Sequence, residues 1–389
     1  MRTILIAGAL AGVLALGTAA PASSTRVATL PLHVSNDSGR SEQVHLYVLG
    51  TDLASGRLGY VTESGTFTPW PAGSNPPSPA PDAAIPGPGP GARKTLRVPR
   101  GTSGRMYMSF GEKLKFFLTP DGLVQPAPWN PSDPNHAILF DWSEFTYNDA
   151  GLWLNSSQVD MFSVPHAVSV TGGGGTKRTG LLVPGGRDRV FDAVRAQPGW
   201  DGLISTRPDG TRLRVLSPGK ALDAGRFSAS YLDGYVDQAW NTYRSRTLTV
   251  VPFQNEPGTR FEGRTDAAGA LQFTDGSGAR VATFHKPSTR DVLGCDGRLH
   301  APNDRVVGPI ARTLCAGLHR STLGHLHTQP TYDAADFYKQ DVTDHYSRVI
   351  HANMTDGRAF GFAFDDVGGF ESLVHDAAPT SAEIALTPF

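Results

Sequence analysis

Residues 70–93 contain so much proline and glycine that neither a helix nor an inner β-strand can persist through them. Alternating apolar and polar runs flank this stretch, TLPLHVSND and QVHLYVLGTD before it, and KTLRVP, RMYMSFG and KLKFFLTP after it. Such alternation is typical of short β-strands separated by turns. Since the chain has 44 Gly and 30 Pro in 389 residues and few helix-favouring runs, we predict a turn-rich β fold with residues 70–93 as a surface loop.

The pattern changes after the four glycines of residues 172–175. Apolar residues then recur at spacings of three and four, which is typical of amphipathic helices. Strand-like runs lie between these segments, so this part of the chain is predicted to be mixed α/β. The predicted helices cover residues 188–197, 232–246, 307–322 and 334–350.

The N-terminus has the three parts of a secretory signal peptide. A positive start, Met1-Arg2, precedes an apolar run over residues 4–16 and then the small residues GTAAPA, with Ala20 and Ala22 as candidate cleavage points. The alternative is a buried N-terminal helix. We interpret residues 1–22 as a signal peptide and expect a secreted, extracellular protein.

The rest of the chain divides into two predicted domains. A β domain covers residues 23–178, and residues 356–389 return to it because their pattern is again strand-like. A mixed α/β domain covers residues 179–355. The predicted fold class is therefore mainly β with an α/β part, and a groove between two such domains is a common place for a ligand.

The charge balance excludes several classes of partner. The chain has 35 Lys and Arg against 36 Asp and Glu, with no basic patch of the kind that nucleic acids require. After the signal peptide, no apolar segment reaches the length that a membrane-spanning helix needs. We expect no nucleic-acid partner, no membrane association after signal cleavage, and a monomer.

Two cysteines, Cys295 and Cys315, fit an oxidising compartment. An isolated pair in a secreted protein is most simply one disulfide. The alternative to a disulfide is a catalytic cysteine with a histidine partner. Two cysteines are too few for a Cys-rich zinc site, and we expect neither a metal nor another cofactor.

Residues 141–162, DWSEFTYNDAGLWLNSSQVDMF, place two carboxylates among aromatics, amides and hydroxyls. Glycoside hydrolysis uses two carboxyls that flank one bond, with an aromatic face and hydrogen-bonding groups for the sugar. On a strand that ends near Asn148, alternation puts Glu144 and Thr146 on the same face. The second acid, Asp160, follows a turn at residues 149–151. The alternative is that both acids are solvated strand residues or turn caps.

The spacing of the two acids sets a condition on a catalytic pair. In a plain hairpin, Asp160 would lie opposite about residue 140, roughly 13 Å from Glu144. A catalytic pair needs about 5–9.5 Å. The sequence therefore predicts a bulge, bend or loop that brings Asp160 closer.

The same segment resembles the core motif of glycoside hydrolase family 64, the bacterial endo-β-1,3-glucanases with a thaumatin-like domain. The resemblance runs through SGRMYMSFG (103–111), ILFDWSEFTYNDAGLWLNSSQVDMFSVP (138–165) and GFAFDDVGGFESLVHD (361–376). It implies a thaumatin-like β-barrel or sandwich beside a mixed α/β domain, with a wide groove between them. It also implies cleavage of internal β-1,3 bonds of laminarin, curdlan or fungal wall glucan, with release of oligosaccharides such as laminaripentaose.

The resemblance further implies roles for single residues. Glu144 matches the general acid and Asp160 the general base of an inverting mechanism. The positions that match glucan contacts are Thr146, Asn148, Trp153 and Ser157. At the position of Ser157, a Thr hydroxyl serves the same purpose in the family. Two alternatives stay open, a retaining glucanase and a non-catalytic thaumatin-like protein that binds β-glucan or acts against fungi. A binding protein does not need both acids.

Overall fold

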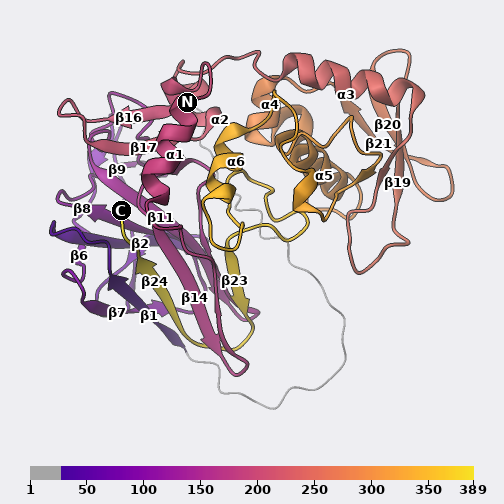
Figure 1. Ribbon diagram of the computed structural model, residues 1–389. Coiled ribbons are helices and arrows are strands. Elements are labelled where there is room, and N and C mark those ends of the chain that lie inside the picture. Colours follow the sequence, from indigo (N-terminus) through magenta and orange to yellow (C-terminus); the bar gives the residue numbers. More distant parts are fainter. Residues whose placement is uncertain (1–27) are drawn as a thin grey trace.

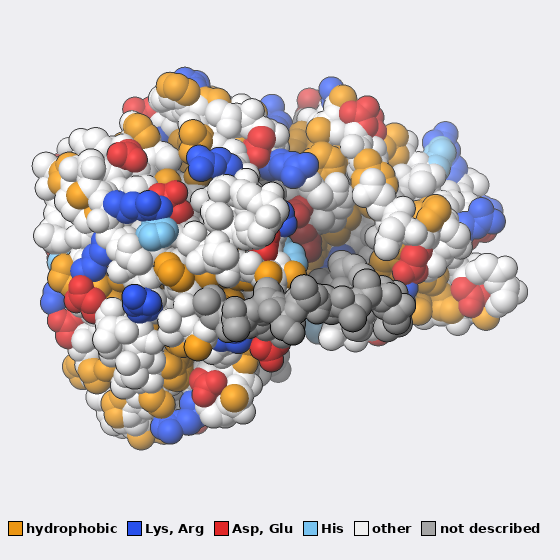
Figure 2. All heavy atoms as spheres, turned by 90° about the horizontal axis from the view of Figure 1, so that it is seen from below, with side chains coloured by type: hydrophobic (Ala, Val, Ile, Leu, Met, Phe, Trp, Pro, Cys, Tyr) orange, Lys and Arg blue, Asp and Glu red, His pale blue; other side chains and the backbone are white. Residues whose placement is uncertain are grey.

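The computed structural model describes residues 28–389 (Figure 1). The predicted signal peptide, residues 1–22, lies outside the described residues. Most β-strands gather in one part of the molecule, and the helices α3, α4 and α5 lie with a second group of strands in the other part. Figure 2 shows the two parts side by side, with acidic side chains visible where they meet.

Two antiparallel-rich sheets form a sandwich around the first core. The alternation of side chains along the strands explains this packing: in TLPLHVSN, every second side chain points inward and is buried. The outer sheet has the order β15 (Gly175–Arg178), β14 (His166–Gly172), β24 (Pro379–Leu386), β1 (Thr29–Asn36), β7 (Arg93–Pro99). The central sheet has the order β23 (Leu373–Asp376), β12 (Gly151–Ser156), β11 (Leu139–Asn148), β8 (Thr102–Phe110), β2 (Val44–Asp52), β3 (Leu58–Val61), β4 (Phe67–Pro69), with β6 (Ile85–Pro86) paired to β2.

The second face of the central sheet carries another core, built from its large aromatic residues. Tyr47, Tyr107 and Trp142 from this face are packed with residues of α1 (Gly186–Arg195), α6 (His345–Ala352) and two small sheets. One small sheet has the order β10 (Gly122–Val124), β9 (Phe117–Thr119), β5 (Ser78–Pro79), and the other β13 (Met161–Phe162), β17 (Arg212–Leu216), β16 (Ile204–Thr206). Helix α2 (Pro218–Asp223) follows β17 directly. This core therefore joins the central sheet to residues far along the chain.

The third core belongs to the α/β part. Its sheet has the order β21 (Arg280–His285), β20 (Ala270–Thr274), β19 (Phe261–Thr265), β18 (Leu248–Val250), β22 (Thr328–Gln329). Helices α3 (Asp233–Ser245), α4 (Thr289–Gly294) and α5 (Val307–His319) contribute to the same core. Short 3₁₀ turns occur at Asp201–Leu203, Gly297–Leu299 and Ala334–Asp336.

The predicted fold class is confirmed at the level of a mainly β protein with an α/β part. The predicted β-barrel is wrong, because the strands of residues 28–389 form several open sheets and no closed barrel. The thaumatin-like form stays a prediction. Strands β23 and β24, near the C-terminus, pair within the central and outer sheets. The domain boundaries stay a prediction. No helix within residues 28–389 combines the length and the apolar character that crossing a membrane requires.

The predicted disulfide between Cys295 and Cys315 is present. It ties the residue that ends α4 to the middle of α5, and both cysteines are buried in the third core. The bridge therefore fixes α4 against α5.

Removing this disulfide should lower the free energy of unfolding by about 3 kcal/mol, because it closes a loop of about 20 residues in the unfolded chain. The measurement is denaturant unfolding of a Cys295→Ser/Cys315→Ser variant against the oxidised parent. Reduced parent protein is the control and should show the same loss. An unchanged unfolding midpoint in both would show that the bridge does not stabilise the fold.

Candidate active site

Strands β11 and β12 form a tight hairpin that places the first candidate acid. Asn148 pairs with Gly151, so the loop is only two residues long. The Asn148 Oδ1 accepts a hydrogen bond of 2.8 Å from the Ala150 backbone N–H and shapes the turn. Gly151 has a φ of 119°, a conformation that favours glycine. The resulting register puts Glu144 opposite Asn155 and Thr146 opposite Trp153.

Two rows of polar and aromatic side chains cross the central sheet on this face. In the first, which we call the acid row, Arg105 pairs with Glu144 and Glu144 with Asn155. The second, the stacking row, lies two residue pairs further toward the hairpin turn, on the same face. Its members, from β8 to β23, are Ser103, Thr146, Trp153 and His375. The opposite face of the same strands is apolar and fills the sandwich core.

Contacts within the stacking row hold its side chains in place. The Ser103 and Thr146 hydroxyls are 2.7 Å apart and share a hydrogen bond. The Trp153 and His375 rings stack with their centroids 4.2 Å apart. Trp153 is half-buried, Thr146 is buried, and Ser157 is buried just beyond the end of β12. Thr146 and Trp153 therefore lie side by side, whereas Asn148 lies at the hairpin turn.

The chain leaves the hairpin before it reaches Asp160. Strand β12 ends at Ser156, and the Gln158 backbone N–H then donates to the Phe360 carbonyl over 2.9 Å. The Gln158 side chain also accepts from the Phe360 N–H over 3.0 Å. Asp160 immediately precedes β13, which pairs with β17. The Asp160 carbonyl accepts a hydrogen bond of 3.0 Å from the Ser217 N–H. The bend that the sequence required is therefore present.

Arg105 connects the two candidate acids. Its Nη2 lies 3.0 Å from the Glu144 Oε1 and 3.5 Å from the Asp160 Oδ2. Since both oxygens contact one nitrogen, they are at most about 6.5 Å apart, the sum of these distances. This upper limit lies at the lower end of the about 6.5–9.5 Å of inverting pairs and above the about 5–5.5 Å of retaining pairs, and it is well below the roughly 13 Å of a plain hairpin.

A second cation, Lys220, completes the cluster. Its Nζ lies 3.3 Å from the Asp160 Oδ1 and 4.4 Å from the centroid of the Trp129 ring. Two positive charges thus face two carboxylates. Sequence reasoning missed both cations: Arg105 lies in a strand motif whose pattern signals only a β-strand, and Lys220 has no local pattern at all.

The electrostatics of Arg105 keep it charged. Burial alone would lower its pKa, but the neighbouring Tyr107, Glu144 and Asp160 raise the pKa above its usual range. Its guanidinium also lies 4.6 Å from the Trp142 ring centroid, a favourable cation–π distance. Arg105 is therefore a fixed positive charge between the acids.

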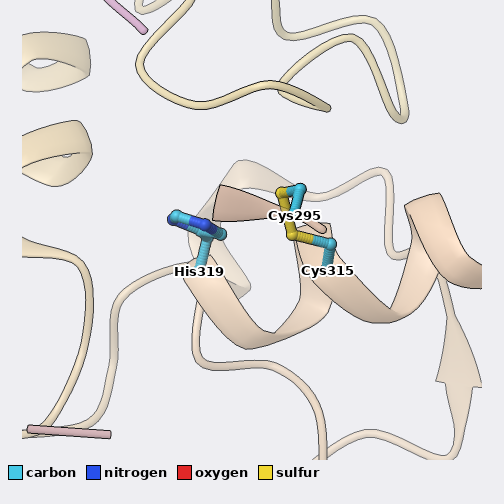
Figure 3. Close-up of side chains that lie close together, drawn as sticks. All are labelled: Cys295, Cys315 and His319. Atoms are coloured by element: carbon cyan, nitrogen blue, oxygen red, sulfur yellow. A yellow bond between two sulfur atoms is a disulfide. The ribbon is translucent and has the colours of Figure 1, made fainter. Parts of the chain in front are cut away.

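A different cluster consists of three residues of the types that bind metal ions, Cys295, Cys315 and His319 (Figure 3). Both sulfurs are joined in the disulfide, so neither is a free thiolate. The His319 Nδ1 lies 2.7 Å from the Asp344 Oδ2, and its Nε2 lies 2.9 Å from the Val292 carbonyl oxygen. The cluster is therefore satisfied by protein partners and does not fit a metal ion or a cysteine nucleophile.

Comparison with known proteins gives consistent matches over almost the whole chain. The sequence model of glycoside hydrolase family 64, described as β-1,3-glucanase, matches residues 28–386. Glucan endo-1,3-β-glucosidases of Arthrobacter sp. (strain YCWD3) and Cellulosimicrobium cellulans are each 49% identical over 389 residues, which is 99% of this chain and 69% of theirs. A crystal structure of a laminaripentaose-producing β-1,3-glucanase in complex with laminaritetraose matches with a TM-score of 0.90 and 55% identity, covering 93% of this chain and 99% of that one.

Proposed function

The chain belongs to the β-1,3-glucanases of glycoside hydrolase family 64, and on this basis we propose the reaction that its site performs. The protein is an endo-β-1,3-glucanase, as its relatives are. The single observation that carries the mechanism is the acid pair, Glu144 and Asp160, held on the two sides of Arg105. These two carboxyls are the catalytic residues.

The proposed roles are that Glu144 protonates the leaving oxygen and Asp160 accepts the proton from water. The surroundings of Asp160 support its role as the base, because both of its oxygens face a cation, Arg105 on one side and Lys220 on the other. Glu144 has one cation, Arg105, which contacts its Oε1 through both Nε and Nη2. The Glu144 side chain is also the more exposed, 29% against 14% for Asp160.

The proposed reaction is a single displacement with inversion. Asp160 takes a proton from a water molecule, the water oxygen attacks the anomeric carbon, and Glu144 gives its proton to the departing glycosidic oxygen. To give its proton to the glycosidic oxygen, Glu144 must separate from Arg105 when the substrate binds. Arg105 can then remain on Asp160.

The glucan runs across the strands of the central sheet, over the acid row and the stacking row. The exposed part of Trp153 supplies an apolar surface for a glucose ring, with Thr146 beside it and Asn148 further along at the hairpin turn. The groove of the thaumatin-like form is proposed to lie at the junction of the two parts of the molecule that Figure 2 shows side by side. The substrates are glucans of laminarin or curdlan type or fungal wall glucan, with laminaripentaose among the products. We also propose that the protein is secreted and monomeric.

The test is proton NMR of a linear β-1,3-glucan during the first minutes of digestion. We expect the α-anomer of the new reducing end to appear first and then to equilibrate with the β-anomer. Chromatography of the same digest gives the product length. A β-anomer that appears first would contradict inversion, because only a retaining enzyme with a covalent intermediate produces it. If no β-glucan is cleaved, the site only binds glucan.

A further inference from the structure

Asp160 is held by two cations that come from different parts of the chain. Arg105 belongs to the central sheet and divides its contacts between Asp160 and Glu144. Lys220 lies on α2, where its Nζ is 3.3 Å from the Asp160 Oδ1. Arg105 is thus shared between the two acids, whereas Lys220 contacts only Asp160 of the two.

The position of Lys220 is built into the fold. Strand β13 pairs Met161 with Leu216, and the next residue, Ser217, donates its backbone N–H to the Asp160 carbonyl over 3.0 Å. Helix α2 starts one residue later, which brings Lys220 back over the Asp160 side chain. The same short segment therefore holds both the main chain and the carboxylate of Asp160.

Trp129 fixes the direction of the Lys220 side chain. The ammonium lies 4.4 Å from the centroid of the Trp129 ring, which itself packs against the second core. An ammonium on an indole face is attracted by the ring and loses freedom of rotation. Lys220 is only 24% exposed, so this ion pair is shielded more than an ordinary surface pair.

From this geometry we infer that Lys220, held by Trp129, is a positioning residue that keeps the Asp160 carboxylate aimed at the attacking water. The inference rests on the proposed function, in which Asp160 is the general base. Its consequence concerns pH: because an opposite charge favours an ionised carboxyl, removal of the Lys220 charge should move the acid limb of the activity profile to higher pH.

The other groups around Asp160 do not replace Lys220. Tyr107 on β8 and Tyr346 on α6 face it, and burial raises the pKa of both phenols, so both are neutral in the working range. Arg105 is shared with Glu144. Loss of Lys220 therefore leaves Asp160 beside one shared cation and one acid.

The experiment is the pH profile of kcat/KM for laminarin with Lys220→Met, Lys220→Arg and Trp129→Leu. We expect the acid limb of the Lys220→Met profile to lie about one pH unit higher, since a neighbouring opposite charge shifts a carboxyl by that order. Lys220→Arg should return the limb toward that of the parent. Trp129→Leu should shift it in the same direction as Lys220→Met, but less.

A matched control removes a lysine ion pair elsewhere. Lys286, which pairs with Asp237 on α3, is half-exposed and far along the chain, so Lys286→Met should leave the profile unchanged. A Lys220→Met enzyme that loses activity equally at every pH would overturn the inference and leave Lys220 a packing residue. Failure of the proposed function is distinct: the parent protein itself would then release no sugar from laminarin.

Discussion

Replacing Glu144 by Gln should lower the kcat for laminarin hydrolysis by about 10²- to 10⁴-fold, the usual contribution of a positioned acid or base. The amide has the size of the carboxyl but carries no proton that can be transferred to the glycosidic oxygen. Asp160→Asn should lower kcat by a similar factor, because the amide cannot accept a proton from water. The measurement is reducing-sugar release under saturating substrate.

An activated substrate and an added nucleophile distinguish the roles of the two acids. An aryl laminarioside with a nitrophenolate leaving group needs no proton from the enzyme, so Glu144→Gln should regain most of its activity on it. Asp160→Asn should stay slow on the same substrate, and added azide should restore turnover by attacking the anomeric carbon without a base. Glu262→Gln, on the exposed side of β19, is the control and should behave as the parent. If Asp160→Asn regained activity on the aryl substrate and azide restored Glu144→Gln instead, the acid and base roles of the two residues would be exchanged.

Replacing Asp365 by Asn should destabilise the protein by about 3–5 kcal/mol, because it leaves buried positive charge without its partner. Asp365 is fully buried. Its Oδ1 is 3.0 Å from the Arg320 Nη2, and its Oδ2 is 2.8 Å from the His351 Nε2 and 2.9 Å from the Gly361 N. Together these contacts tie the turns of residues 361–367 to α5 and α6. The measurement is the free energy of unfolding in denaturant.

The pH dependence of this loss has a defined sign. Burial alone would raise the pKa of Asp365, but His351 and Arg320 lower it below its usual range. Burial alone would lower the pKa of His351, but Asp365 raises it. Asp365 thus adds stability above about pH 4, and this contribution is lost as the pH falls through its lowered pKa. His351 adds stability below about pH 6.5, and this contribution is lost as the pH rises through its raised pKa.

The difference between parent and Asp365→Asn should therefore be largest between about pH 4 and 6.5 and smaller on both sides. The matched control is its neighbour, Asp366→Asn. Burial raises the pKa of Asp366 to about 6, and its Oδ1 has no hydrogen-bond partner among residues 28–389. A neutral amide should cost little there. Equal losses for both variants would show that Asp365 is not stabilised by its ion pairs.

The sequence predicted the hairpin of the site well because its causes are local. Alternation in FDWSEFTYN and the turn at Asp149-Ala150 determine which side chains share a face, and the register follows from the turn length. Helices α1, α3 and α5 were likewise predicted from their apolar spacing. These elements need no knowledge of distant residues.

What the sequence could not predict depends on contacts between distant segments. The bend before Asp160 is made by Phe360, 200 residues further on, whose main chain binds Gln158. Arg105 and Lys220 reach the acids from β8 and α2, 39 and 60 residues away from their partners. Residues 358–366, expected as a strand, form turns, because Asp365 is buried in ion pairs.

The order of strands in the outer sheet has a consequence for the time at which this protein can fold. Strand β24 lies between β14 and β1 and runs parallel to β1, with Leu32 opposite Ala382 and Asn36 opposite Leu386. Without β24 the outer sheet falls into two separate pairs, and the first core stays open. The sandwich can therefore close only after residues 379–386 have been synthesised, and the strands of the outer sheet that are made earlier must wait for them.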